Sequence, residues 1–316
     1  MTKVLVTGSQ GFIGQVLVQK LLREGLGGRP VGKLTQVDLA ADNPHGDDRV
    51  QVIRGSLADT DVRHAAIESH PDVIFHLASV PGGAAEREPE LGRRVNLDAT
   101  LALLENCRTL QRPPRFIYAS SVAVYGEQLG DVLHEDALPA PAISYGAHKL
   151  MCEIAVADAS RRGWVQGCSL RLPGVVARPD ENKGLISAFM SQLFWSIANG
   201  DAITLPVSAH GTCWWISVGA CVDNLLHIAA MDTAPWSATR QYQMPVLHLS
   251  IQQVVEAVAQ RFGHSVNDLV RYAPDPAVER LFASAPPLLT PKAERLGLKS
   301  DGSIATLVER ALDHFK

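Results

Sequence analysis

Residues 3–14 read KVLVTGSQGFIG, and this stretch decides the fold. The apolar run at residues 4–6 is typical of a strand buried on both faces of a parallel sheet. Gly8, Gly11 and Gly14 follow at intervals of three, and apolar residues then recur with helical periodicity. A strand, a glycine turn and a helix in this order present backbone N–H groups to a pyrophosphate at the helix N-terminus. Glycine triplets alone are weak evidence for a dinucleotide site, so an ordinary turn with incidental glycines is the alternative.

Length and composition limit the classes of protein to consider. The chain has 316 residues, enough for one large domain or two linked lobes. Its formal net charge is −4 and it has no basic run, so neither nucleic acid nor an acidic membrane is an expected partner. It shows no signal peptide and no apolar stretch that would span a bilayer. The five scattered cysteines form no CxxC pair, which predicts reduced, mostly buried thiols, no metal site and a cytoplasmic location.

An acidic residue follows the second predicted strand. Residues 34–37, LTQV, are predicted to form this strand and lead into Asp38. A carboxylate about 20 residues past a glycine turn accepts hydrogen bonds from an adenosine ribose in dinucleotide-binding folds. It would also repel a 2′-phosphate, so it favours NAD over NADP. The alternative is a surface aspartate in a loop.

Further strands are predicted at residues 50–54, 72–77 and 115–119, with helical segments between them. Repeated strand–helix units with right-handed crossovers imply an α/β fold with a Rossmann-type doubly wound parallel sheet. Ligands of such sheets bind outside the carboxyl ends of the strands. Gly8, Asp38, Ser79 and Ser121 all follow strands, so we expect them to line one crevice.

Two polar residues lie within apolar surroundings. His76 belongs to a predicted strand, and Asn96 belongs to one long helix predicted over residues 86–110. Buried histidine and asparagine side chains are more often structural hydrogen-bonding groups than catalysts. We therefore expect both to be structural in the first instance.

Residues 144–149 read SYGAHK and carry the clearest catalytic pattern. A helix is predicted to begin at Ser144, with that residue as its cap. Tyr145 and Lys149 are four residues apart and share one helical face. A nearby ammonium group favours a phenolate, which lets a tyrosine act as general acid or base, and Ser121 can donate a hydrogen bond to the reacting oxygen. Alone, a tyrosine and lysine at this spacing often mark a solvated helix face.

The segments TGSQGFIG, HLAS, SSVAVYG and YGAHK resemble the extended short-chain dehydrogenase/reductase superfamily, which includes the NAD-dependent epimerase/dehydratase family. In that superfamily the tyrosine transfers the carbinol proton, the lysine holds the nicotinamide ribose and the serine polarises the substrate. The resemblance implies an NAD-dependent enzyme with Ser121, Tyr145 and Lys149 as its catalytic residues. The chain departs from the family pattern at Ser56, where the family usually has an aspartate that contacts adenine. The implied cofactor-binding residues are Gly8, Gln10, Gly11, Phe12, Ile13, Gly14, Asp38, Ser56, Leu57, Leu77, Ala78, Ser79, Asn96, Tyr145, Lys149 and Pro173.

Departures from the family pattern narrow the chemistry. Val122 and Ala123 stand where the 4,6-dehydratases have an aspartate–glutamate pair, so that chemistry is not expected. Nucleotide-sugar epimerases hold the substrate diphosphate with an arginine-x-x-asparagine pattern and a second arginine. Here Gly174 follows Arg171 in place of the asparagine, and the segment GTCWWISVG has no arginine. Because a diphosphate needs charge-assisted donors, we expect a smaller substrate without a nucleotide.

The segments GRRVNLDAT, RLPGVVARPDENKG and PLLTPKAERLGLKSDGSIATLVER are most similar to the D-erythronate dehydrogenase group of this superfamily. That resemblance implies oxidation of a secondary hydroxyl of a small sugar acid or polyol. The implied substrate-binding residues are Ser79, Ser121, Tyr145, Gly174, Arg178, Asn182, Lys183 and Trp215. The alternative for the charged loop residues is a solvated loop, and the alternative for the tryptophan is core packing.

Residues 1–172, rejoined by about 218–246, are predicted to form the NAD-binding Rossmann domain. Residues 173–316 are predicted to form mainly a smaller α/β substrate-binding lobe. Helices equivalent to residues 86–110 and 144–162 form a four-helix interface in relatives, so a homodimer is expected by analogy. A nucleotide-sugar epimerase and a non-catalytic, NAD-sensing regulator are the two alternative functions. The missing diphosphate donors argue against the first, and the complete Ser/Tyr/Lys set argues against the second.

Overall fold

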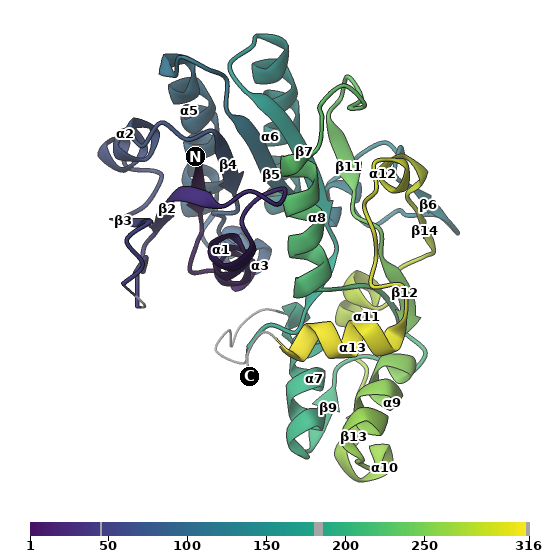
Figure 1. Cartoon of the computed structure of the whole chain (residues 1–316). Coiled ribbons are helices and arrows are strands. Elements are labelled where there is room, and N and C mark those ends of the chain that lie inside the picture. The colour runs from purple at the N-terminus through teal and green to yellow at the C-terminus, as the bar shows by residue number, and fades with distance from the viewer. Residues whose placement is uncertain (45, 180–185, 314–316) are drawn as a thin grey trace. The chain divides into compact units, whose positions relative to one another are not determined.

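The computed structural model describes residues 1–44, 46–179 and 186–313, which divide into two compact units (Figure 1). Both units are discontinuous in sequence. Unit 1 comprises Met1–Gly126, Pro139–Arg171 and Val222–Gln243, and unit 2 comprises Glu127–Leu138, Leu172–Cys221 and Met244–Lys316. All five cysteines are buried and free, as predicted. No helix in the described part of the chain is long and apolar enough to cross a membrane.

A seven-stranded sheet in the order β11-β7-β5-β4-β1-β2-β3 forms the centre of unit 1. The pairs β1–β2, β1–β4, β2–β3, β4–β5 and β7–β11 are parallel. The chain order reverses at β1, which lies between β2 and β4, and this is the switch point where ligands of doubly wound sheets bind. The predicted Rossmann-type sheet is therefore confirmed. Its strands are β1 (Thr2–Thr7), β2 (Val31–Asp38), β3 (Val50–Arg54), β4 (Val73–His76), β5 (Arg115–Ser121), β7 (Gln166–Leu172) and β11 (Gln241–Gln243).

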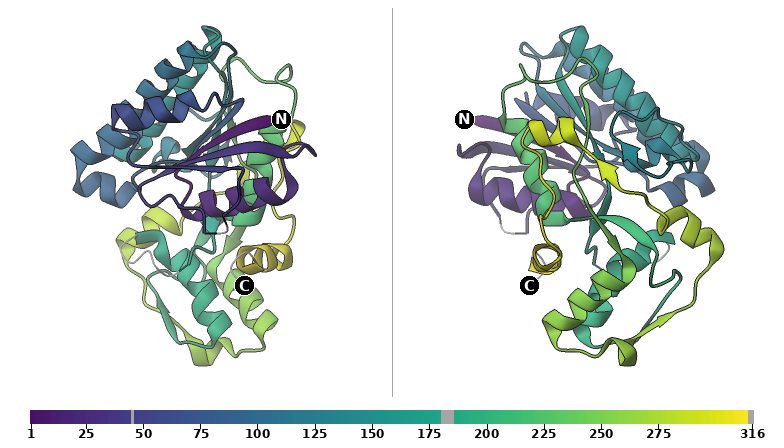
Figure 2. Two further views of the ribbon diagram at one scale, coloured as in Figure 1. Left: turned by 60° about the vertical axis from the view of Figure 1, so that its left-hand side comes forward. Right: turned by 90° about the vertical axis from the view of Figure 1, so that its right-hand side faces the viewer.

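Helices cover both faces of this sheet (Figures 1 and 2). On one face, α1 (Phe12–Glu24) lies beside α8 (Val218–Ala230), and an ion pair between Lys20 and Asp223 joins the two helices. On the other face lie α2 (Thr60–Glu68), α5 (Ala99–Asn106) and α6 (Ser144–Arg161). Buried residues of β1, β4, β5, α5 and α6 form one apolar core there, which includes Leu5, Ile74, Phe116, Leu103 and Val156.

The prediction of a single helix over residues 86–110 is wrong. The chain instead forms α3 (Gly82–Arg87), α4 (Pro89–Arg93), a π-helical turn η1 (Arg94–Asp98), α5 and a 3₁₀ turn η2 (Cys107–Thr109). Pro89 causes the first break, because a proline disfavours helical geometry in the residue before it. Glu88 accordingly has φ −129° and ψ 72°.

Unit 2 has a three-stranded sheet in the order β12-β10-β8 and two strand pairs, β13-β9 and β14-β6. Its strands are β6 (Leu133–His134), β8 (Gly174–Val176), β9 (Ile203–Leu205), β10 (Thr212–Ser217), β12 (Leu247–Ser250), β13 (Val270–Tyr272) and β14 (Leu288–Leu289). Its helical segments are η4 (Ile186–Ala188), α7 (Phe189–Asn199), α9 (Ile251–Phe262), α10 (Val266–Leu269), α11 (Pro276–Phe282), α12 (Pro291–Arg295) and α13 (Ile304–Leu312).

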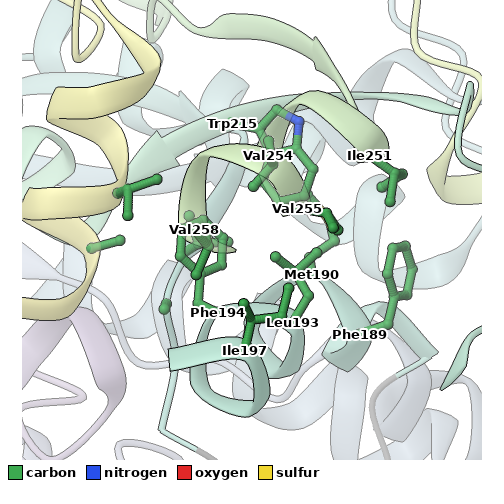
Figure 3. Packing of buried hydrophobic residues seen from close by; sticks show 14 of the residues in the cluster. Phe189, Met190, Leu193, Phe194, Ile197, Trp215, Ile251, Val254, Val255 and Val258 are labelled. Atoms are coloured by element: carbon green, nitrogen blue, oxygen red, sulfur yellow. The ribbon is translucent and has the colours of Figure 1, made fainter. Parts of the chain in front are cut away.

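The core of unit 2 forms between α7, α9 and β10. Figure 3 shows Phe194, Trp215 and Val258 from these three elements pointing toward one another. Helix α9 begins with a capping box between Ser250 and Gln253.

Candidate active site

The glycine turn joins β1 to α1 at the carboxyl edge of the sheet in unit 1. Gly8 has φ +69°, and a Cβ atom there would lie 2.7 Å from the backbone nitrogen of Ala78. A Cβ on Gly14 would lie 2.2 Å from the carbonyl oxygen of Gly8. Gly11 is the N-cap of α1 and provides no side chain to cap the first turn. The turn is thus compact and has no side chain at its three glycine positions, as a cradle for phosphate groups requires. Phe12 and Ile13 begin α1 immediately after it.

The Asp38 carboxylate is hydrogen-bonded to the glycine turn. Its Oδ2 accepts a hydrogen bond from the Gln10 N–H at 3.1 Å, and its Oδ1 accepts one from the Ala40 N–H at 3.2 Å. The Gln10 side chain in turn donates to Asp42 Oδ1 at 3.2 Å. A carboxylate held beside a helix N-terminus can receive ribose hydroxyl groups on one side of a phosphate cradle. Near it, the Gly55 N–H donates to the Asp38 carbonyl, which brings the segment containing Ser56 and Leu57 to the end of β2.

The loop after β4 passes close to the same turn. The Leu77 N–H donates to the carbonyl of Thr7 at 3.2 Å. Asn96 then holds the next part of the loop, because its Oδ1 accepts from the Val80 N–H at 2.7 Å and from Ser79 Oγ at 3.1 Å. Its Nδ2 donates to the Val80 carbonyl at 2.9 Å. Asn96 therefore has the structural role expected for a buried asparagine, and it fixes the position of Ser79.

His76 is also structural, as predicted. It is 1% exposed and bridges Thr7 Oγ1 at 2.7 Å and Thr100 Oγ1 at 2.9 Å. Burial, and to a smaller degree the charge of Lys149, lowers the pKa of His76 to about 3. The imidazole is thus a neutral link between β1, β4 and α5 beneath the glycine turn. The two threonine partners were not predicted, since neither has a distinctive local pattern.

The predicted catalytic residues lie on β5 and α6. Lys149 is 3% exposed, and its ammonium donates to the carbonyl of Ala119 at 2.7 Å. The same Nζ lies 4.9 Å from the ring centroid of Tyr118 and 5.4 Å from that of Tyr145. Ser121 ends β5, and its Oγ accepts from the Ala123 N–H at 3.2 Å at the start of a 3₁₀ turn, η3 (Val122–Tyr125). A cation held beside a phenol, next to the strand that carries a serine, is suited to proton transfer.

The start of α6 differs from the prediction. Ser144 is the first helical residue and not the cap, which is Ile143. The Ser144 N–H is satisfied instead by Glu86 Oε1 of α3 at 2.6 Å. Gly146 then allows α6 to approach η3 closely, because a Cβ atom there would lie 2.4 Å from the carbonyl oxygen of Ala123. These contacts set the helix that carries Tyr145 against the turn that follows Ser121.

A buried ion pair that was not predicted from the sequence lies next to these residues. Arg171 on β7 is 1% exposed and donates to Glu153 through its Nε at 2.9 Å and its Nη2 at 2.8 Å. Burial opposes the charge of this guanidinium, but the hydrogen bonds and charge of Glu153 raise the pKa of Arg171. Two signals were available: Glu153 lies four residues after Lys149, and Arg171 is the one charged residue in the strand QGCSLRL.

The remaining predicted substrate residues belong to unit 2 or are not described. Pro173 is buried, and Gly174 packs tightly, since a Cβ atom there would lie 2.8 Å from the carbonyl oxygen of Trp214. Arg178 is anchored through its main chain, with its N–H donating to Ser191 Oγ and its carbonyl accepting from Trp195 Nε1. The predicted residues outside the described ranges are Asn182 and Lys183.

Trp215 lies in the core of unit 2. It is 0% exposed, its Nε1 donates to the Leu249 carbonyl at 3.1 Å, and its ring centroid lies 6.2 Å from that of Phe194 (Figure 3). A side chain without exposed surface has no face for a substrate. The geometry thus favours the packing alternative for this residue. Among residues 1–44, 46–179 and 186–313, no group of three potential ligands is arranged to hold a metal ion.

Comparison with known proteins agrees with this arrangement. The model of the NAD dependent epimerase/dehydratase family matches residues 4–257. The chain is 36% identical to a D-erythronate dehydrogenase from Cupriavidus necator, with 98% of each chain covered. It is 29% identical to a D-erythronate dehydrogenase from Haemophilus influenzae, with 99% of each covered. A crystal structure of a nucleoside-diphosphate-sugar epimerase from Agrobacterium tumefaciens has a TM-score of 0.93 at 30% identity, covering 99% of this chain and 94% of that one.

Proposed function

Because the chain belongs to the NAD-dependent epimerase/dehydratase family, we propose that it is an NAD-dependent dehydrogenase of a small sugar acid, with D-erythronate as the first substrate to test. The observation that carries this proposal is the Lys149 ammonium, which lies close to the rings of both Tyr118 and Tyr145 and is bound to the strand that ends at Ser121. Nearly full-length similarity to two D-erythronate dehydrogenases supports the substrate class. Unit 1 is the proposed NAD-binding part, and unit 2 is proposed to contribute substrate contacts.

The residues around the glycine turn fit a dinucleotide. Side chains at positions 8 and 14 would collide with the backbone of the turn or of the loop after β4, and Asp38 supplies a carboxylate beside the turn. The proposed cofactor contacts remain those predicted from the sequence, with Ser79 and Asn96 acting through the loop that they hold together. When bound, NAD supplies the acceptor for a hydride from the carbinol carbon.

The chemistry of the proposed site assigns one task to each catalytic side chain. Tyr145 takes the proton of the substrate hydroxyl as general base. Lys149 holds a positive charge beside the ring of that tyrosine. The Ser121 oxygen accepts from Ala123, which orients the hydroxyl so that its O–H can donate to the substrate oxygen. These tasks require no metal ion or covalent intermediate.

The enzyme alternative is a nucleotide-sugar epimerase, which the similarity to the Agrobacterium structure favours. Such an enzyme needs cationic donors for a diphosphate. Arg171, at the family position for one of them, is buried and bound at two points by Glu153. Breaking a buried pair to free one partner costs several kcal/mol, on the order of 3–5. This cost favours a substrate without a diphosphate.

The proposed substrate contacts are Ser79, Ser121 and Tyr145 from unit 1, and Gly174, Arg178, Asn182 and Lys183 from the segment after β7. A sugar-acid carboxylate needs a cation or several donors, and Arg178 and Lys183 are the cationic members of this group. Trp215 is left out of the proposed contacts because it is fully buried.

One experiment separates the functions. The purified protein is mixed with NAD or NADP and with D-erythronate, other aldonates of four to six carbons, alditols or UDP-sugars, and reduced cofactor is followed by absorbance. The dehydrogenase proposal expects NADH formation with a sugar acid. Conversion of a UDP-sugar to its epimer without net NADH would establish the epimerase instead. Tight NAD binding without turnover of any compound would favour the NAD-sensing regulator.

We also propose that the protein is a homodimer that associates through α5 and α6. These helices pack together and expose apolar side chains, since Leu101 is 41%, Met151 43% and Ile154 63% exposed. Exposed apolar groups gathered on adjacent helices are typical of an association surface. A cytoplasmic location stays a prediction that rests on the reduced cysteines.

A further inference from the structure

The Glu153–Arg171 pair is an unusual feature for the interior of a sheet protein. Both residues are 1% exposed, and the guanidinium and carboxylate share two hydrogen bonds. Removing two charges from water is costly, so buried pairs of this kind often stabilise a protein no more than apolar residues would. Stability alone is thus a poor explanation of the pair, and the groups around it suggest another.

The pair is attached to the strand end that carries Ser121. Ser120 Oγ donates to Glu153 Oε1 at 2.5 Å, while Lys149, one helical turn earlier on α6, donates to the carbonyl of Ala119. Two successive residues of β5 are therefore held by two side chains of the helix that carries Tyr145. Ser121 is the next residue along the strand.

Arg171 extends the attachment to the turn after Ser121. Its guanidinium carbon lies 4.8 Å from the ring centroid of Tyr125, the last residue of η3. The Arg171 carbonyl accepts from Gln243 Nε2 at 3.0 Å, which ties β7 to β11. The ion pair thus contacts the catalytic helix, the strand before Ser121 and the turn after it.

We propose that Glu153 and Arg171 are positioning residues, which act through Ser120 and Tyr125 to set Ser121 against Tyr145 for proton transfer. The inference rests on the proposed dehydrogenase function for its kinetic consequence, but its structural consequence is independent of the substrate. Neither residue touches substrate. Their effect is to restrict the catalytic serine and tyrosine to one relative arrangement, and small misplacements of catalytic groups have large kinetic effects.

Ser120→Ala is the sharpest variant, because it cuts the link to the strand and leaves the ion pair intact. Glu153 Oε1 keeps its hydrogen bond from Arg171 Nε, so no buried charge loses its partner. Ser169→Ala is the matched control: Ser169 is also 1% exposed and lies on β7, but its hydroxyl has no hydrogen-bond partner among the described residues.

With the sugar acid that the wild type oxidises, Ser120→Ala should lower kcat about tenfold or more, while the KM for NAD stays within about twofold of wild type. The primary deuterium isotope effect on kcat should rise, because the chemical step becomes more rate-limiting. Ser169→Ala should match wild type in kcat, in the KM for NAD and in the isotope effect. A Ser120→Ala enzyme with wild-type kcat and isotope effect would overturn the proposal. A lower melting temperature with an unchanged isotope effect would assign Ser120 a purely structural role and also overturn it.

A second measurement does not depend on the substrate. Hydrogen–deuterium exchange of the NAD complex is compared for wild type, Ser120→Ala and Ser169→Ala. Amides in residues 119–126 should exchange faster only in Ser120→Ala, since the hydrogen bond from the Ala123 N–H to Ser121 Oγ depends on the strand end. Unchanged exchange would refute the positioning role. If the wild type oxidises no sugar acid, the proposed function fails and the exchange result alone decides this inference.

Discussion

The ammonium of Lys149 lies 5.4 Å from the ring centroid of Tyr145, one helical turn away on α6. A hydrogen bond from this ammonium to the Ala119 carbonyl fixes it at the end of β5. Because Lys149 is buried, water screens its charge only weakly. The phenol is thus beside a fixed positive charge, an arrangement suited to the general acid–base role proposed for Tyr145.

Removing the Tyr145 hydroxyl should abolish proton transfer and spare cofactor binding. Tyr145→Phe keeps the ring that lies near Lys149, so we expect turnover to fall by roughly 10²–10⁴-fold while the Kd for NAD changes little. Steady-state NADH formation and calorimetric titration with NAD provide the two measurements. Tyr272→Phe, which removes a phenol in unit 2, is the control. Substantial activity in Tyr145→Phe would show that another group is the base.

The charge of Asp38 should set the preference for NAD. Asp38→Asn keeps an oxygen for the Gln10 N–H and removes the negative charge that would repel a 2′-phosphate. We expect the ratio of kcat/KM for NAD to that for NADP to fall at least about tenfold, because like charges placed together cost several kcal/mol. Asp61→Asn makes the same charge change at an exposed position of α2 and should not change this ratio. If both variants kept the wild-type ratio, Asp38 would not contact the ribose.

The parts of the site that rest on local pattern could be predicted. Gly8 and Asp38 follow consecutive parallel strands, and parallel strands end at one edge of a sheet, so their proximity follows from topology. Tyr145 and Lys149 are four apart on one helix, so their shared face follows from helical periodicity. The neutral, buried state of His76 follows from its position inside an apolar run.

The parts that rest on tertiary contacts could not be predicted. The Ser144 N–H is satisfied by Glu86, 58 residues away, and nothing near Ser144 in sequence signals this partner. Arg171 and Glu153 pair across two different elements, and the resemblance to known families suggested a ligand for this arginine instead. Residues 213–216 of β10 form a continuous apolar run, which is equally consistent with a pocket-lining or a buried Trp215, and only the packing of α7 and α9 decides between them.

The close contact at Gly8 should make this position far less tolerant than another glycine of similar backbone geometry. Gly8 has φ +69° and Gly28 has φ +74°, so alanine costs about 1–2 kcal/mol of backbone strain at either position. Only at Gly8 would the new Cβ also collide with the backbone of Ala78, whereas nothing lies within 4 Å at Gly28. We expect Gly8→Ala to lose NAD binding and to melt at a clearly lower temperature than Gly28→Ala. Equal melting temperatures and NAD affinities would argue against a tight phosphate cradle.

A charge on the exposed face of α6 should dissociate the proposed dimer. Ile154 is 63% exposed, so glutamate fits there without disturbing the fold of one chain, but it would be buried at an interface at high cost. Light scattering after size exclusion should report a dimer for wild type and a monomer for Ile154→Glu. Leu138→Glu, at an exposed leucine of unit 2, should remain dimeric. A monomeric wild type would contradict the proposed association.

The buried His76 should make stability fall as the pH is lowered. Folding lowers the pKa of its imidazole from an ordinary value near 6.5 to about 3, so between these values the unfolded chain binds a proton that the folded chain does not. The contribution of His76 is complete above pH 6.5 and is lost on acidification, by up to about 1.4 kcal/mol per pH unit. His76→Gln removes the titrating group, so its unfolding free energy should be lower at pH 7 but should decline less steeply between pH 6.5 and 4.5. Urea denaturation at several pH values measures how the unfolding free energy of wild type and of His76→Gln changes with pH. His64→Gln, at an exposed position of α2, is the control that should retain the wild-type slope. Identical slopes for wild type and His76→Gln would mean that His76 binds its proton equally well in the folded and unfolded chain.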